Sequence, residues 1–350
     1  MDIGNSPPSE PGNGGGGAGG QSRRRRWPFV VGGLVALGLL VLTVGLIVLV
    51  LAIGTSGPSA ASAVYEEEYI SGSGPAKIAV VPIQGTIVPA DAAVAGVQPT
   101  STPEGLADAL TQAKDDESVA AIVLEVNSPG GGVTASDMMQ QSILDFKGSS
   151  GKPVVVSMED TAASGGYYIS TAADRIVASE TTLTGSLGVF IPLLNFREAA
   201  EKYGVTQTYI KSGKYKTMGS SWKELTPKER EIFQSIVDHY YDEFVEVIVE
   251  GRDLPESRVR EIADGRIYSG EQAKNLGLVD RLGELEKATG IARSLANVEE
   301  TTVVRYVESP NLVESLQARL APPEPEAVHI MREAGLDLEP KPYYLYLPGI

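Results

Sequence analysis

Apolar residues are arranged along the chain in two ways, first as one long uncharged run and later as short runs that alternate with helical patterns. Residues 29–53 form the long run and contain no charged side chain. As a helix, at about 1.5 Å per residue, they would measure roughly 37 Å, enough to cross about 30 Å of hydrocarbon. The small residues at 60–63 resemble a signal-peptide cleavage site, but the apolar core of a cleaved signal is usually only about 7–15 residues long. The pattern therefore favours an uncleaved, single-pass membrane anchor.

The residues on either side of this run set its expected orientation and limits. Four consecutive arginines, 23–26, precede it, and positively charged flanks remain on the cytoplasmic side. We expect a disordered cytoplasmic tail at 1–27, rich in Gly, Pro and Ser, an anchor at 28–54 and a linker at 55–76. The rest of the chain is then expected outside the cytoplasmic membrane.

Residues 77–300 are expected to form one α/β domain. Buried-strand patterns at 78–83, 119–126, 154–158, 176–178, 189–194 and 207–211 alternate with helical patterns at 102–113, 133–146, 164–173 and 195–203. This alternation predicts helices packed on a largely parallel sheet. A capping box at Thr226 and Glu229 begins a long helix whose broad apolar stripe indicates a core or subunit-packing role. Shorter helices are predicted at 256–263 and 270–276.

Residues 301–350 are assigned to a C-terminal extension with a weak pattern. Its aromatic end, residues 343–347, is a strand candidate. Such a strand either lies in a groove and imitates a substrate, or forms a sheet edge or an oligomer contact.

The amino-acid composition excludes several kinds of catalytic and binding site. The chain has 350 residues, a formal net charge of −16, no cysteine and two histidines. Without cysteine, disulfides, zinc–thiolate sites and thiol catalysis are excluded. The acidic balance argues against binding nucleic acid through a basic face. Metal-ligand spacings and a nucleotide-binding GK[ST] loop are absent from the sequence, so no cofactor or metal is expected.

Ser164 is the candidate nucleophile. It follows the predicted strand at 154–158 and begins a helix, where backbone N–H groups and the helix dipole favour negative charge. Gly165 and Gly166 leave room for a peptide carbonyl, and the N–H of Gly165 is a candidate oxyanion donor. The alternative is that Ser164 is an ordinary helix N-cap and that the glycines allow close packing.

A glycine-rich turn at 127–132 is the second candidate element. It follows the predicted strand at 119–126, at the end of a sheet where open α/β folds place their sites. The amides of Gly131 or Gly132 are candidates for the other half of an oxyanion hole. Asn-Ser-Pro-Gly is also a common tight turn, and that interpretation stays open.

The base is expected to be a lysine rather than a histidine. His239 lies within the long amphipathic helix and His329 in the C-terminal extension, and neither has suitable partners nearby in sequence. Residues 211–216 offer Lys211, Lys214 and Lys216 at a predicted strand end. A lysine acts as a base only where its surroundings favour the neutral amine, and any one of these lysines alone is also readily explained as solvated surface charge.

Four segments in order resemble the signal peptide peptidase A family, membrane-anchored serine proteases of peptidase family S49, in its short single-repeat form. The segments are residues 126–132, 163–168, 183–189 and 211–216, and the resemblance runs from about residue 77 to residue 285. It implies Ser164 as nucleophile, Lys216 as general base and Ser186 as the serine that orients this lysine. Thr217 stands where relatives often have an aspartate.

The resemblance also implies a fold and an assembly. The fold would be the crotonase/Clp-protease-like spiral of β and α units, and the protein would form a ring-like homo-oligomer. In double-length relatives the serine and the lysine lie in different repeats, which implies that Lys216 here reaches Ser164 of a neighbouring subunit.

The sequence therefore predicts a membrane-anchored endopeptidase with a Ser-Lys dyad that cleaves residual signal peptides or other membrane-derived peptides through an acyl-enzyme. Two alternatives stay open: a crotonase-type acyl-transfer enzyme and a catalytically silent membrane scaffold.

Overall fold

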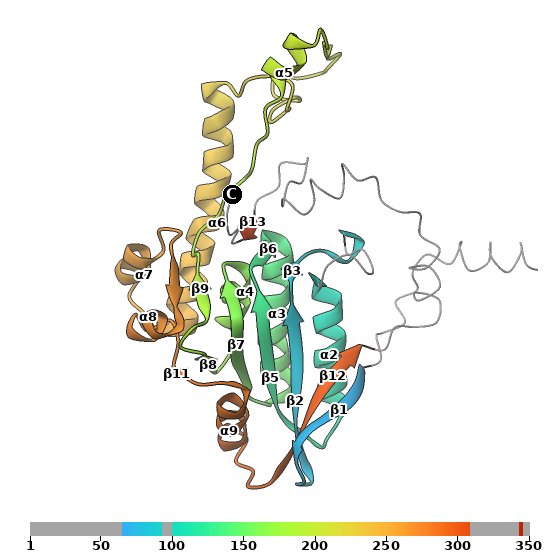
Figure 1. The fold of residues 1–350 in the computed structure, drawn as a ribbon, viewed down its shortest axis with the longest axis vertical. Coiled ribbons are helices and arrows are strands. Elements are labelled where there is room, and N and C mark those ends of the chain that lie inside the picture. The colour runs from blue at the N-terminus through green and yellow to red at the C-terminus, as the bar shows by residue number, and fades with distance from the viewer. Residues whose placement is uncertain (1–64, 93–99, 309–342, 346–350) are drawn as a thin grey trace, which may run out of the picture. The chain divides into compact units, whose positions relative to one another are not determined.

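The computed structural model describes residues 65–92, 100–308 and 343–345 (Figure 1). The expected tail at 1–27, the anchor at 28–54 and most of the expected linker lie outside these residues. So do His329 and most of the C-terminal extension. Among the described residues, no helix is both long enough and apolar enough to cross a membrane.

A nine-stranded sheet forms the centre of the domain. Its main path runs β1-β12-β2-β5-β7-β8-β11, and β9 and β10 continue from the end of β7. All neighbours along this path are parallel except β1 and β12. The strands are β1 (Tyr65–Gly72), β2 (Ala76–Gln84), β5 (Val119–Ser128), β7 (Val154–Ala163), β8 (Arg175–Ala178), β9 (Leu183–Gly185), β10 (Ile267–Ser269), β11 (Arg281–Leu282) and β12 (Thr301–Glu308).

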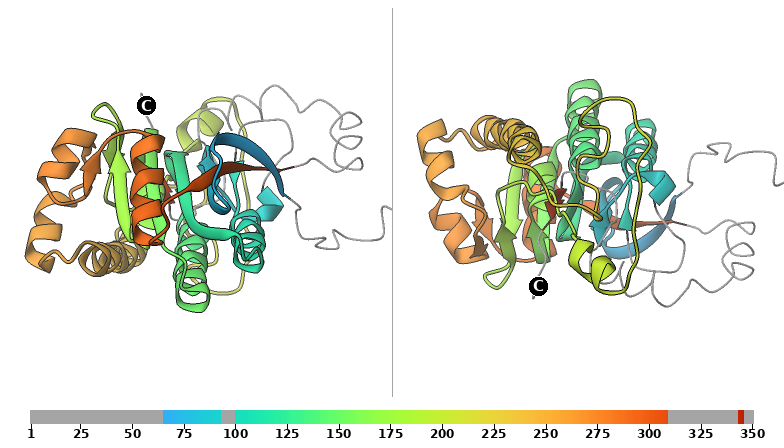
Figure 2. Two further views of the ribbon diagram at one scale, coloured as in Figure 1. Left: turned by 90° about the horizontal axis from the view of Figure 1, so that it is seen from below. Right: turned by 90° about the horizontal axis from the view of Figure 1, so that it is seen from above.

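Both faces of this sheet are covered, which explains why its central strands are apolar at nearly every position. On one face Ile122 and Leu124 of β5 join a large core with α2 (Pro103–Asp115) and α3 (Val133–Ser150). On the other face Ala121 and Val123 pack with α9 (Leu285–Leu295) in a smaller cluster. Figure 2 shows α9 and the α2–α3 pair on opposite sides of the strands.

A small second sheet lies where β2 and β5 end. Its order is β13-β6-β3-β4, with β3 (Thr86–Ile87), β4 (Thr100–Ser101), β6 (Gly130–Gly132) and β13 (Tyr343–Leu345). β3 follows β2 and β6 follows β5, so the parallel pairing of β2 with β5 brings the two short strands together. A short 3-10 helix, Ala90–Ala92, follows β3.

The long helix α6 (Pro227–Arg252) begins at the predicted capping box: the Thr226 hydroxyl accepts from Glu229 N, and the Glu229 carboxylate accepts from Thr226 N. Its buried apolar residues, Phe244, Val245 and Ile248, all lie near its C-terminal end. The N-terminal part extends away from the sheet beside the segment that carries α5 (Arg197–Lys202) (Figure 1). The chain then returns through α7 (Glu256–Ile262) and α8 (Gly270–Asn275) to the sheet.

Most predicted elements are confirmed, but two predicted strands are wrong. Residues 189–194 and 207–211 form no strand, and α5 is the only regular element between β9 and α6. This segment leaves the sheet, so its apolar residues have no neighbouring strand to pair with. Ile210, which the periodicity placed in a buried strand, is fully exposed.

The structured region is also wider than residues 77–300. β1 lies within the segment assigned to a linker, and β12 lies within the segment assigned to the C-terminal extension. The two strands pair with each other at the edge of the sheet, and β12 pairs with β2. β1 is the edge strand and is largely exposed, which explains why its sequence shows no apolar alternation, whereas β12 pairs on both sides and is mostly buried.

Candidate active site

Ser164 has the conformation of a strained residue at a strand-to-helix turn. It lies between β7 and α4 (Gly165–Ser170) with φ of 52°, in a region that residues other than glycine rarely adopt. Its side chain is completely buried, and its Oγ has no hydrogen-bond partner. The hydroxyl makes no capping bond to the helix. The N-cap alternative therefore does not account for this serine.

Backbone hydrogen bonds hold Ser164 in this position. Its N–H donates to the carbonyl of Gly185 at 2.8 Å, and its own carbonyl accepts from Tyr168 N at 2.8 Å. Ala163, directly before it, is in register with Gly185 of β9. The neighbouring strand and the helix thus fix both sides of the turn and maintain the positive φ.

Two tyrosines that the sequence analysis did not single out for a role anchor α4 behind Ser164. Tyr167 is fully buried and donates its hydroxyl to the carbonyl of Leu278 at 2.8 Å. Tyr168 donates to Asp137 of α3 at 3.1 Å. Burial raises the pKa of both phenols, so both remain neutral donors. Their position directly after two glycines was the available signal, since large side chains there must pack into the core.

The glycine-rich turn and the Ser164 turn lie against each other, as the sequence predicted. Ser128 at the end of β5 is in register with Ala162 of β7. A Cβ on Gly166 would lie 2.7 Å from the carbonyl oxygen of Ser128, so only glycine allows α4 to approach this closely. The Ser128 hydroxyl accepts from Gly130 N at 3.1 Å and shapes the turn.

The three predicted oxyanion donors belong to the two segments that meet where Gly166 approaches Ser128. Gly165 is the first residue of α4, where backbone N–H groups have no acceptor within the helix. Gly131 and Gly132 belong to β6, which follows the Ser128 turn and contacts α4. Gly131 is packed tightly, since a Cβ there would lie 1.8 Å from the carbonyl oxygen of Ile87.

Ser186 directly follows strand β9, just as Ser164 directly follows the neighbouring strand β7. It follows Gly185 as Ser164 follows Ala163, and those two residues are in register. Ser186 also has a positive φ, 51°, and its N–H donates to the carbonyl of Arg266 at 2.8 Å. The structure therefore brings Ser164 and Ser186 to adjacent strand ends, about 4.8 Å being the usual spacing between strands.

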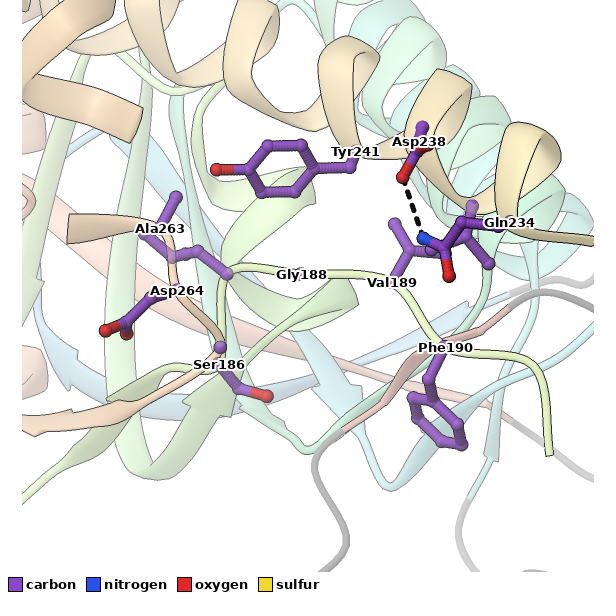
Figure 3. A pocket seen from close by; sticks show the side chains of 12 residues that line it. Ser186, Gly188, Val189, Phe190, Gln234, Asp238, Tyr241, Ala263 and Asp264 are labelled. Carbon is purple, nitrogen blue, oxygen red and sulfur yellow. Dashed lines mark hydrogen bonds between the residues drawn. The ribbon is translucent and has the colours of Figure 1, made fainter. Parts of the chain in front are cut away.

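Ser186 lines a pocket of about 490 Å³ between its own loop, α6 and the loop after α7 (Figure 3). Val189 and Phe190 contribute an apolar wall, while Asp238 and Asp264 give the lining two carboxylates. Ser164 and Lys216 are not among the lining residues.

Lys216 is not brought to the other site residues within the chain. It is exposed, in a turn between α5 and α6, and not at a strand end against apolar walls. Within the described residues its Nζ makes no hydrogen bond or ion pair, whereas Lys211 Nζ donates to the Lys214 carbonyl and to the Thr217 hydroxyl. Eight large apolar side chains of the segment between β9 and α6 are 36% exposed or more: Leu193, Phe196, Tyr203, Val205, Tyr209, Ile210, Tyr215 and Trp222.

His239, which the sequence did not favour as a base, is exposed on α6, and its Nε2 lies 3.4 Å from Glu243 Oε1. It makes no contact with Ser164, whose Oγ has no hydrogen-bond partner.

The chain matches known proteins over this region. Residues 147–299, which include Ser164, Ser186 and Lys216, match the family described as peptidase family S49. A putative signal peptide peptidase SppA from Enterococcus faecium is 37% identical over 249 residues, which are 68% of this chain and 72% of the relative. Protease 4 from Haemophilus influenzae is 36% identical over 231 residues, 66% of this chain but only 37% of that protein. Among solved structures, a mutant of ClpP1 from Listeria monocytogenes aligns with a TM-score of 0.39 and 19% identity, covering 60% of this chain and 93% of that one.

Proposed function

The chain is a serine endopeptidase of peptidase family S49, and we propose that it works through a Ser-Lys dyad formed by Ser164 and Lys216. The observation that carries this proposal is the conformation of Ser164: a buried hydroxyl without a hydrogen-bond partner, held at a positive φ at the start of a helix. A structural serine would use its hydroxyl, because leaving it unpaired in the interior costs about 1–3 kcal/mol. A nucleophile needs the hydroxyl free for substrate and base.

The proposed reaction is acyl transfer to the serine followed by hydrolysis. Ser164 Oγ attacks the peptide carbonyl carbon while its proton passes to the neutral amine of Lys216. The amides of Gly165 and of Gly131 or Gly132 stabilise the oxyanion, and such a donor is worth about 3–4 kcal/mol in related sites. The C–N bond then breaks and the lysine returns the proton to the leaving amine. A water, deprotonated in the same way, hydrolyses the acyl-enzyme.

Lys216 is proposed to act on Ser164 of a second copy of this chain. The supporting observations are the unpartnered Oγ of Ser164, the exposed Lys216 without a partner, and the exposed apolar side chains around that lysine. Ser186, at the strand end beside Ser164, is proposed to accept a hydrogen bond from the incoming ammonium or to donate one to the neutral amine. A ring-like homo-oligomer would provide this arrangement at every site.

The cellular setting is part of the proposal. Residues 28–54 would anchor the protein in the cytoplasmic membrane with its N-terminus inside and its catalytic domain outside. Remnants of signal peptides and other membrane-derived peptides would then be the substrates available near the catalytic domain. We also propose that the α/β domain belongs to the Clp-protease-like spiral folds.

The test is labelling with a fluorophosphonate and cleavage of an apolar fluorogenic peptide by the full chain. We expect Ser164→Ala to abolish labelling and Lys216→Ala to lower the peptidase rate at least about a thousandfold. Lys214→Ala, two residues away and also exposed, is the matched control and should retain activity.

Each alternative has its own outcome. A silent scaffold would leave the wild-type serine unlabelled, and a crotonase-type acyl-transfer enzyme would bind coenzyme A. Retention of peptidase activity by either the Ser164→Ala or the Lys216→Ala variant would refute the dyad.

A further inference from the structure

A turn between α7 and β10, residues 263–266, lies directly beside Ser186. Its first three residues line the same pocket as Ser186, and Figure 3 shows Ala263 and Asp264 next to that serine. The fourth residue, Arg266, accepts the Ser186 N–H on its carbonyl at 2.8 Å. Neither Asp264 nor Arg266 has a part in the proposed reaction, so their role in this position needs its own explanation.

The side chains of Asp264 and Arg266 close this turn on itself. Asp264 Oδ1 accepts from the Arg266 amide at 3.2 Å and from Arg266 Nε at 2.8 Å, and Asp264 Oδ2 accepts from Nε and Nη2. These hydrogen bonds from Arg266 lower the pKa of Asp264, which is therefore an ionised acceptor. Gly265, with φ of 87°, lets the chain reverse between the two. The closed turn fixes the direction in which the Arg266 carbonyl points.

The same turn is connected to Ser164 through backbone contacts. It leads into β10, whose Ile267 is opposite Gly185 of β9. A Cβ on Gly185 would lie 2.6 Å from Tyr268 Cδ2 and 2.9 Å from the Arg266 carbonyl oxygen, so only glycine fits there. The Gly185 carbonyl in turn accepts the Ser164 N–H at 2.8 Å. The β9–β10 pair and its turn thus hold the backbone N–H groups of both serines.

The exposure of the ion pair indicates what it contributes. The side chains of Arg266 and Asp264 are 65% and 41% exposed, and exposed ion pairs add little to stability. Ser186, however, has a positive φ of 51°, a conformation that persists only where its surroundings hold it. We therefore expect the pair to affect the geometry at Ser186 more than the free energy of unfolding.

We propose that Asp264 and Arg266 are positioning residues of this active site, and that the turn they close holds the Ser186 hydroxyl where the Lys216 amine arrives. They act through the Arg266 carbonyl and the backbone of Ser186. This inference rests on the proposed function and adds to it two residues that the Ser-Lys dyad does not include.

The test compares full-length Asp264→Ala, Arg266→Ala and Arg266→Lys. We expect both alanine variants to lower kcat for an apolar peptide about tenfold or more, with KM and the free energy of unfolding unchanged. Arg266→Lys, which keeps a cationic donor for Asp264, should recover part of the lost kcat. Arg258→Ala is the matched control, because it removes the exposed ion pair of Arg258 with Glu261 on α7 and should keep the wild-type kcat.

Two further measurements distinguish positioning from a general structural role. Because Arg266 acts through Ser186, Arg266→Ala should cause no further loss of kcat in a Ser186→Ala background. Hydrogen exchange needs no turnover, and the Ser186 amide should exchange faster in Arg266→Ala but not in Arg258→Ala.

The inference and the proposed function fail in different ways. Wild-type kcat in both alanine variants, fully additive losses with Ser186→Ala, or unchanged exchange of the Ser186 amide in Arg266→Ala overturns the positioning role. Retained peptidase activity in Ser164→Ala or Lys216→Ala refutes the dyad instead.

Discussion

Single residues decide whether the turn at Ser164 can form, and the glycines beside Ser164 are the clearest case. Gly166 lets the start of α4 approach the carbonyl of Ser128, and this contact joins the turn at Ser164 to the glycine-rich turn at 127–132. Gly148, in contrast, lies in α3 with open space around the position of a Cβ. The two glycines therefore provide a matched pair for measuring how much a close backbone approach at Gly166 contributes to stability and activity.

We expect opposite effects from alanine at these two positions. Gly166→Ala forces a methyl group to within 2.7 Å of a backbone oxygen, and overpacking of this kind costs about 1–3 kcal/mol. It should also reduce peptidase activity, because α4 begins directly after Ser164, the proposed nucleophile. Gly148→Ala should stabilise the protein by about 0.5–1 kcal/mol, the usual gain in an exposed helix interior.

Denaturant unfolding measures both free energies. If Gly166→Ala were as stable as Gly148→Ala, the close contact between α4 and the Ser128 turn would not constrain the site.

At the scale of elements, the start of α6 matters because this helix bounds both the pocket beside Ser186 and the segment that carries Lys216. Glu229 lies at the centre of this helix start. Its carboxylate accepts from Lys223 Nζ at 2.6 Å and from Thr226 N at 3.0 Å. The hydrogen bond from Lys223, followed by the one from the Thr226 amide, lowers the pKa of Glu229 to about 2.

This lowered pKa predicts a pH dependence of stability. A carboxylate whose pKa is lower in the folded than in the unfolded chain stabilises the fold above the unfolded value, roughly 4.3. The contribution is lost as pH falls from that value through the folded pKa of about 2. We expect the unfolding free energy of the wild type to fall more steeply between these pH values than that of Glu229→Gln.

The comparison is made by denaturant titration at several pH values. Glu231→Gln is the matched control, since Glu231 is an exposed residue of the same helix. Equal slopes for the wild type and Glu229→Gln would contradict the assignment.

At the scale of the whole molecule, the two residues of the proposed dyad, Ser164 and Lys216, lie in different surroundings. Ser164 is buried near the end of the sheet, and Lys216 lies exposed on the segment that extends beside α6 (Figure 1). A dyad shared between copies has a consequence that a dyad within one chain lacks, because two inactive variants can complement each other.

We predict that mixing Ser164→Ala with Lys216→Ala, after reversible dissociation and reassembly, restores part of the peptidase activity. A mixed assembly contains some sites with an intact serine from one chain and an intact lysine from the other. A dyad within one chain would give no recovery. The control mixture, Ser164→Ala with Ser164→Ala/Lys216→Ala, must stay inactive under either arrangement.

The local sequence pattern by itself determined many of the helices and strands of this protein. The continuous apolar stretch of β5, the capping box of α6 and the glycine motif around Ser164 each depend on neighbouring residues, and the structure confirms the elements they predicted. The mistaken strands at 189–194 and 207–211 have a physical cause, since an apolar run becomes a strand only where another strand pairs with it.

Tertiary structure decided what depends on contacts between distant segments. Only the register of β7 with β9 puts Ser164 and Ser186 at adjacent strand ends. Only the fold leaves the Ser164 hydroxyl unpaired and Lys216 in solvent, and only the pairing of β13 with β6 gives the C-terminal strand a partner. These pairings join residues far apart in the chain, and apolar periodicity carries no information about which edge a strand will meet.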